Sequence, residues 1–236
     1  MAVYDLEEQE QIDELKTWWK RYGNLVTGGA LAITLSVAAW QGWNWWQRSQ
    51  ASQAGALYSA VEQASRSHDA KKAREATGEL IDKYPGTTYA GMAALLSARA
   101  QAEASDFKTA QAQLQWAADH ARDEGLRDLA HLRLASMLLD EKAYDDALKA
   151  ISTEPSLPFA ARFSEVRGDI LSAQGKGAQA RAAYQAGLNK YDEMQKTAGL
   201  EQRQSPYRDM LQVKMEFQGA ALPTPAGAAK PEEKRP

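Results

Sequence analysis

The sequence predicts an all-α protein in which a single N-terminal transmembrane helix is followed by an array of helical pairs, an α-solenoid. Two observations carry this prediction: a long uncharged segment ringed by tryptophans near the N-terminus, and a helix-forming remainder in which turn residues recur at intervals. No run of β-branched residues alternates with polar ones, as it would in a half-buried strand.

Composition narrows the function classes. The chain has 236 residues and a net charge of -3, which allows one or two domains and gives no basic stripe for nucleic acid. It contains no cysteine, which excludes disulfides, thiolate metal sites and cysteine nucleophiles.

The N-terminal segment has the dimensions of a membrane span. No charged residue lies between positions 22 and 47, and a helix over Leu25–Trp46 would rise ~33 Å, about the thickness of a bilayer's hydrocarbon core. Indole rings favour the two membrane interfaces, and tryptophans stand near both ends of the segment: Trp18, Trp19, Trp40, Trp43, Trp45 and Trp46. We therefore expect a membrane anchor.

Two alternatives to an anchor remain open at this point, a cleaved signal peptide and a buried helix of a soluble protein. Ser36-Val37-Ala38 weakly resembles a cleavage site, but the preceding region is long and acidic and the apolar residues continue beyond it. More Lys and Arg lie close before the span than after it, which favours a cytoplasmic N-terminus and, in a bacterium, a periplasmic C-terminal part.

The expected domains follow from this orientation. They are a cytoplasmic amphipathic segment (1–21), a transmembrane helix (22–47), a periplasmic helical domain (48–218) and a disordered Pro/Ala tail (219–236). One helical face of the first segment is apolar, with Ile12, Leu15, Trp19 and Tyr22, and either docks on a partner or membrane surface or merely extends the anchor. Within the span, a stripe of small residues permits close helix–helix packing: Gly28, Ala32 and Ser36.

The remainder shows a repeat. Alanines after successive turns are 37, 37 and 33 residues apart, and residues twelve positions earlier are mostly small; the two sets are Ala73, Ala110, Ala147, Ala180 and Val61, Ala98, Ala135, Gly168. Small residues let two helices cross closely. The pattern is similar to a degenerate tetratricopeptide repeat, with helical pairs at Ala51–Tyr84, Thr87–Arg122, Leu126–Ser152 and Phe159–Tyr191. A non-repetitive helical bundle is the alternative.

The array needs a terminal cap, and Ser205–Phe217 is the candidate, with Met210, Leu211, Lys214 and Phe217 expected on its packed face. Motifs for catalysis are missing. The histidines His68, His120 and His131 have no partner at metal-binding spacing, and there is no nucleophile elbow, phosphate loop or dinucleotide fingerprint. We expect no enzyme activity and no cofactor.

Binding is the function that remains. In stacked helical pairs the first helices line a concave face, which in tetratricopeptide proteins often holds peptides. The positions expected to point inward mix apolar and charged side chains, and each could instead pack on a neighbouring helix: Leu95, Arg99, Leu132, Ser136, Leu139, Arg162, Glu165 and Asp169.

Three stretches carry a resemblance to a known family: VYDLEEQEQIDELKTWWKRYGN, LRLASMLLDEKAYDDALK and VRGDILSAQGKGAQARAAYQAGL. The chain resembles the YfgM-like family, the ancillary subunit of the SecYEG translocon, up to about Phe217; the Pro/Ala tail departs from it. The resemblance implies an inner-membrane protein with a periplasmic tetratricopeptide-like domain. The implied partners are SecYEG, the PpiD-type periplasmic chaperone, exported polypeptides and an RcsB-type regulator.

The function implied by the resemblance is that of a membrane-tethered adaptor that passes exported proteins to periplasmic chaperones. Two other classes stay open: a tetratricopeptide scaffold for another cell-envelope assembly machine, and an enzyme hidden in the groove, which would need a deep polar pocket with converging titratable groups.

Overall fold

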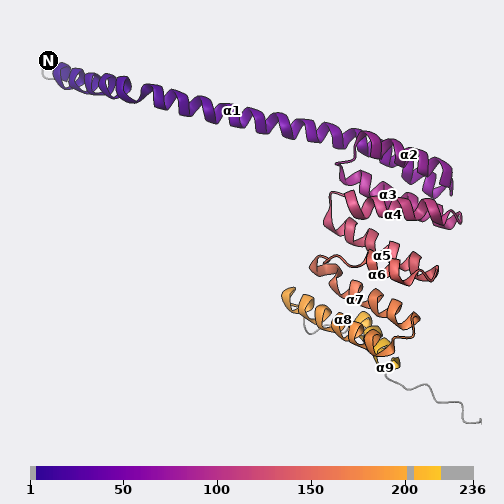
Figure 1. Ribbon diagram of the computed structural model, residues 1–236. Coiled ribbons are helices and arrows are strands. Elements are labelled where there is room, and N and C mark those ends of the chain that lie inside the picture. The colour runs from indigo at the N-terminus through magenta and orange to yellow at the C-terminus, as the bar shows by residue number, and fades with distance from the viewer. Residues whose placement is uncertain (1–3, 201–204, 219–236) are drawn as a thin grey trace, which may run out of the picture. The chain divides into compact units, whose positions relative to one another are not determined.

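The computed structural model describes residues 4–200 and 205–218, with side chains from residue 11 on, so the expected disordered tail (219–236) lies outside the described residues. All regular secondary structure in the described ranges is helical, as the sequence predicts (Figure 1). The helices are α1 (Tyr4–Arg66), α2 (Ala70–Lys83), α3 (Thr88–Glu103), α4 (Phe107–His120), α5 (Glu124–Asp140), α6 (Tyr144–Ala150), α7 (Leu157–Ala173), α8 (Gly177–Thr197) and α9 (Pro206–Phe217).

The chain divides into two compact units, residues 1–53 and residues 54–236. Helix α1 continues without a break through the boundaries expected at 21/22 and 47/48. Of the helices in the described part of the chain, α1 is the one long and apolar enough to cross a membrane, and only 6% of its most apolar window is buried. A core helix of a soluble protein would be mostly covered, so this exposure argues against that alternative.

The second unit is built from stacked helical pairs that follow one another in chain order (Figure 1). The last turns of α1 pair with α2, α3 with α4, α5 with α6, and α7 with α8. All four repeat alanines are completely buried between the helices: Ala73, Ala110, Ala147 and Ala180. Separate apolar clusters form around successive pairs, as expected when each unit is covered by its neighbours.

The turns inside the pairs repeat with the same period as the alanines. His68, Ser105, Lys142 and Gly175 each end the first helix of a pair with a positive φ, between 53° and 73°. In each turn the next residue's N–H returns to a helix carbonyl, for example Asp106 N to Gln101 O at 2.8 Å, which is the Schellman pattern. One turn geometry, repeated four times, therefore fixes the angle at which each second helix returns.

Gly168 shows why the helix crossings need small residues. A Cβ built on this glycine would lie within 3.0 Å of three ring atoms of Tyr184, which comes from the paired helix α8. The ring is held there by its hydroxyl, which donates to Asp169 Oδ1 at 2.8 Å. The glycine thus makes room for an aromatic side chain that fills the α7–α8 interface.

The sequence correctly predicts the start of the terminal helix α9 but not the packing of its last residue. Ser205 caps the helix by accepting a hydrogen bond from Arg208 N, and Leu211 is completely buried. Phe217, expected on the packed face, is 69% exposed, so that expectation was wrong. Phe217 is the last residue of α9 and, at about 100° per residue, lies about 120° around the helix from the buried Leu211.

Candidate partner-binding groove

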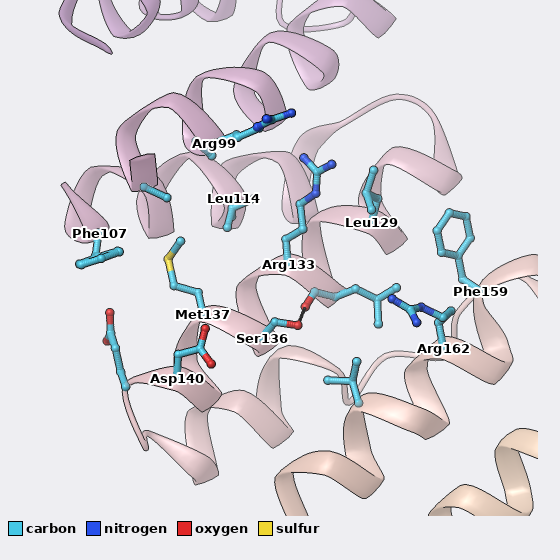
Figure 2. Close-up of a pocket in the computed structure, with 15 residues that line it drawn as sticks. Arg99, Phe107, Leu114, Leu129, Arg133, Ser136, Met137, Asp140, Phe159 and Arg162 are labelled. Atoms are coloured by element: carbon cyan, nitrogen blue, oxygen red, sulfur yellow. Dashed lines mark hydrogen bonds between the residues drawn. The ribbon is translucent and has the colours of Figure 1, made fainter. Parts of the chain in front are cut away.

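An open groove of about 840 Å³ lies where α3, α4, α5 and α7 meet (Figure 2). It is formed by the first helices of three successive pairs together with the start of α4, which is where the repeat predicts a concave surface. The lining residues are Ala98, Arg99, Ala102, Phe107, Leu114, Leu129, Leu132, Arg133, Ser136, Met137, Asp140, Glu141, Phe159, Arg162 and Val166.

Most of the groove surface is apolar, and part of it is open to solvent. Phe107, the first residue of α4, is 47% exposed, although burying a large apolar side chain stabilises a protein. Leu129, Met137 and Phe159 are half-buried along the groove. Such a surface suits apolar side chains of a polypeptide ligand, because covering it removes more apolar area from water.

Three arginines stand on one side of the groove, one each from α3, α5 and α7 (Figure 2). Arg99 Nε lies 2.8 Å from Glu103 Oε1, and Arg162 Nη1 lies 2.8 Å from Glu165 Oε2. Arg133 instead donates to the backbone carbonyl of Leu95 at 3.4 Å. Partial burial, and secondly the charge of Arg99, lower the pKa of Arg133 below its usual value.

Asp140, the last residue of α5, stands on the opposite side (Figure 2), and Glu141, which follows it in the chain, also lines the groove. The amide nitrogen of Gln111 donates to Glu141 Oε1 at 2.8 Å, so one carboxylate is already engaged. Asp140 is exposed and forms no ion pair within the part of the chain that the structure describes. Among the groove's charged residues, Arg133 on one side and Asp140 on the other therefore form no ion pair with the described residues.

Four of the residues expected to point inward line this groove: Arg99, Leu132, Ser136 and Arg162. Leu95 does not, because it is buried in the core between α3, α4 and α5. Leu139 is half-buried and packs against the core between α5, α6 and α7.

Glu165 and Asp169, also expected to point inward, are covered by α9. Lys214 Nζ lies 2.8 Å from Glu165 Oε1 and 2.9 Å from Asp169 Oδ1. Burial of Lys214 opposes its charged form, but the hydrogen bonds to the two carboxylates outweigh burial and raise its pKa. Burial, together with the bond to Asp169, raises the pKa of Tyr184. This cluster of acids thus holds the terminal helix in place.

Sequence reasoning missed several groove residues, chiefly Arg133, Met137 and Phe159. The exposure of Phe107 at the start of α4 was likewise not foreseen. A signal for Arg133 was present, because α3 and α7, the corresponding helices before and after α5 in the repeat, also carry arginines of the groove, Arg99 and Arg162. No group of three or more acidic or histidine side chains in the described ranges could hold a metal ion.

The small-residue stripe in α1 is open. Apart from its own helix backbone, no atom of the described residues lies within 4 Å of a Cβ built on Gly28, and the Ser36 hydroxyl donates to its own helix, at Ala32 O, 2.8 Å away. Ser36 therefore needs no partner to satisfy its hydroxyl in an apolar environment.

Comparison with known proteins identifies the family. The family described as a tetratricopeptide repeat-like domain matches residues 16–217. A Neisseria gonorrhoeae protein named ancillary SecYEG translocon subunit is 30% identical over 220 residues, which span 92% of this chain and 99% of the relative.

Proteins of the same name from Haemophilus influenzae and Escherichia coli show the same relationship. The first is 31% identical over 78% of this chain and 89% of the relative, and the second 28% identical over 80% and 90%. Because these matches cover both the apolar helix and the repeats, the chain belongs to the family of ancillary SecYEG translocon subunits with a tetratricopeptide repeat-like domain.

Proposed function

We propose that this chain is a tethered adaptor of the inner membrane that associates with the SecYEG translocon and helps to pass exported proteins to a periplasmic chaperone of the PpiD type. The relatives' name supports the translocon association. The observation that carries the adaptor role is the apolar groove across α3, α4, α5 and α7, whose exposed Phe107 offers a surface for polypeptide rather than for catalysis.

Tethering makes weak binding sufficient. A domain anchored beside the channel meets each emerging chain at a high effective concentration, so affinity need not be built into a tight interface. A groove that is open and moderately apolar suits an adaptor that must also release its ligand. In this proposal residues 22–47 span the membrane and residues 48–218 form the periplasmic domain.

The groove positions proposed to touch partners are Arg99, Leu132, Ser136 and Arg162. Leu95 and Leu139 support these residues from below, whereas Glu165 and Asp169 act through their ion pairs with Lys214. Gly28, Ala32 and Ser36 supply a face on which another transmembrane helix can pack closely. In this orientation an RcsB-type regulator in the cytoplasm has access only to residues 1–21.

Site-specific photo-crosslinking tests the proposal. A photoreactive residue at the exposed Ser136 should crosslink to translocon subunits, a PpiD-type chaperone or an exported chain, and one at exposed Arg181 on α8 serves as the control. A matching probe at Gly28 should crosslink to a transmembrane helix. If mild-detergent purification recovers only a cell-wall synthase or another envelope machine, the adaptor role at the translocon is wrong.

Topology has its own test. A periplasm-active reporter fused after Phe217 should be active, and the protein should resist carbonate extraction of membranes. A reporter that behaves as cytosolic would reverse the proposed orientation and remove the periplasmic role.

A further inference from the structure

The charges around the groove point to the chemistry of its ligand. Arg99 and Arg162 each have a glutamate partner at 2.8 Å, whereas no carboxylate within the described residues forms an ion pair with Arg133, which stands between them along the stack. Within the described residues its guanidinium donates a hydrogen bond of 3.4 Å to the Leu95 carbonyl, which leaves most of its five N–H donors unused by the protein.

Arg133 is an exposed residue without an ion-pair partner in the described ranges, so a ligand carboxylate can reach it and pair with it. Its guanidinium is partly withdrawn from water and feels the like charge of Arg99, and both effects disfavour its charged form. A ligand carboxylate would offset the like charge of Arg99 and form a bidentate, charge-assisted pair with the guanidinium. Arg133 belongs to the groove surface itself, so that carboxylate would come from the ligand.

The surroundings of Arg133 restrict the ligand further. Leu129 and Phe159 lie on the same side of the groove, and Phe107 and Met137 lie toward the other (Figure 2). A ligand that reaches Arg133 therefore also covers apolar surface on both sides of it. The exposed Asp140 at the far end disfavours a second acidic group there and favours a neutral or basic one.

We propose that the groove binds polypeptide segments in which an acidic residue is flanked by apolar residues, with the carboxylate paired to Arg133 and the apolar side chains against Phe107, Met137 and Phe159. This inference rests on the proposed polypeptide-binding function and adds its selectivity: acidic–apolar segments are preferred over basic–apolar ones. Arg133 is the residue that determines the preference.

The test uses the full chain in detergent micelles and three short fluorescent peptides. The peptides share one apolar sequence and carry a central glutamate, glutamine or lysine. Fluorescence anisotropy at low salt measures the affinity of each for the unmodified protein and for Arg133→Gln, Arg133→Lys and Arg133→Glu. Arg181→Gln, which removes an exposed arginine outside the groove, is the matched control.

The glutamate peptide should bind about tenfold more tightly than the lysine peptide, and Arg133→Gln should remove that difference while Arg133→Lys retains part of it. Arg133→Glu should invert the preference, and Arg181→Gln should leave it unchanged. Equal affinities of the three peptides for the unmodified protein, or an Arg133→Glu variant that keeps the preference for glutamate, would overturn the inference.

A second variant separates this inference from the proposed function. Phe107→Ser shortens a side chain that is already half exposed and should weaken all three peptides alike. If it does so while the peptides bind equally well to the unmodified protein, the groove binds polypeptide and only the acidic preference is wrong. If it weakens none of them, the groove itself is not the binding site, and both the function and the preference are wrong.

Discussion

Replacement of Gly168 by alanine should destabilise the C-terminal helical pair. The new Cβ would lie 2.6 Å from Cδ1 and 2.8 Å from Cζ of Tyr184, far inside normal contact distance, so the ring must move by about 1 Å. The ring has little freedom, because its hydroxyl is bound to Asp169 and Lys214 Nζ lies 5.9 Å from its centroid.

The expected cost follows from three contributions. Overpacking a close helix contact costs ~1–3 kcal/mol. Stretching the Tyr184 hydrogen bond to a carboxylate adds ~1.5–3 kcal/mol if the bond is lost. Alanine gains ~1 kcal/mol over glycine in a helix. The net loss is therefore about 3 kcal/mol, which in a domain of this size lowers Tm by roughly 6–12 °C.

Thermal unfolding followed by circular dichroism measures the loss, and hydrogen exchange should place it in α7, α8 and α9. Gly78→Ala is the matched control, because Gly78 is exposed within α2 and its added Cβ would meet no atom within 4 Å. That control should gain up to ~1 kcal/mol. If Gly168→Ala were as stable as Gly78→Ala, the close crossing of α7 and α8 would not require glycine, and the steric basis of the repeat would be refuted.

Lys142→Gly should stabilise the protein by ~1 kcal/mol, because Lys142 holds a positive φ of 63° that glycine adopts freely; urea unfolding measures it, and Lys142→Ala should give no such gain. Lys214→Met should lower the free energy of unfolding by ~3 kcal/mol, because it leaves the buried Glu165 with fewer partners. Hydrogen exchange should become faster in α9 and the helices that it contacts, and unchanged exchange there would contradict the role of α9 as a terminal cap. Asp128→Ala should lower the free energy of unfolding by ~2 kcal/mol, because the buried carboxylate accepts hydrogen bonds from both the backbone N–H and the hydroxyl of Ser156 at the start of α7. Ser156→Ala keeps the backbone hydrogen bond and should cost less when both variants are compared by urea unfolding. The side-chain and backbone hydrogen bonds of Thr109 lower the pKa of Asp106. The stability that the Asp106 carboxylate adds is therefore present above the usual pKa of 3.8 and is lost as pH falls through the lower pKa of the folded protein. NMR titration should find the midpoint of Asp106 below 3.8, and the destabilisation caused by Asp106→Ala should disappear in acid.

The local sequence pattern predicted the helices and the period of the repeat. The alanines Ala73, Ala110, Ala147 and Ala180 were expected on the packed face of each second helix, and all four are buried. Ser205 and Pro206 marked the start of α9, because a cap and a residue without an N–H are both favoured at a helix N-terminus. The anchor was equally visible, since charge and hydropathy act over one continuous segment.

The groove required the tertiary structure. Arg99, Leu132, Ser136 and Arg162 were expected on the concave face and line the groove, but Arg133, Met137 and Phe159 were not expected there. Which side of a helix faces the concavity depends on how successive pairs pack against each other, and that packing joins residues far apart in the chain.

The sequence by itself determined the membrane-spanning length, the helical class and the period of the repeat, because each depends on residues close together in the chain. Only the tertiary structure decided that Lys214 pairs with Glu165 and Asp169, and that no carboxylate of the described residues pairs with Arg133. These pairings join residues from different helices, and a local pattern carries no information about which charged side chains the packing of those helices brings together.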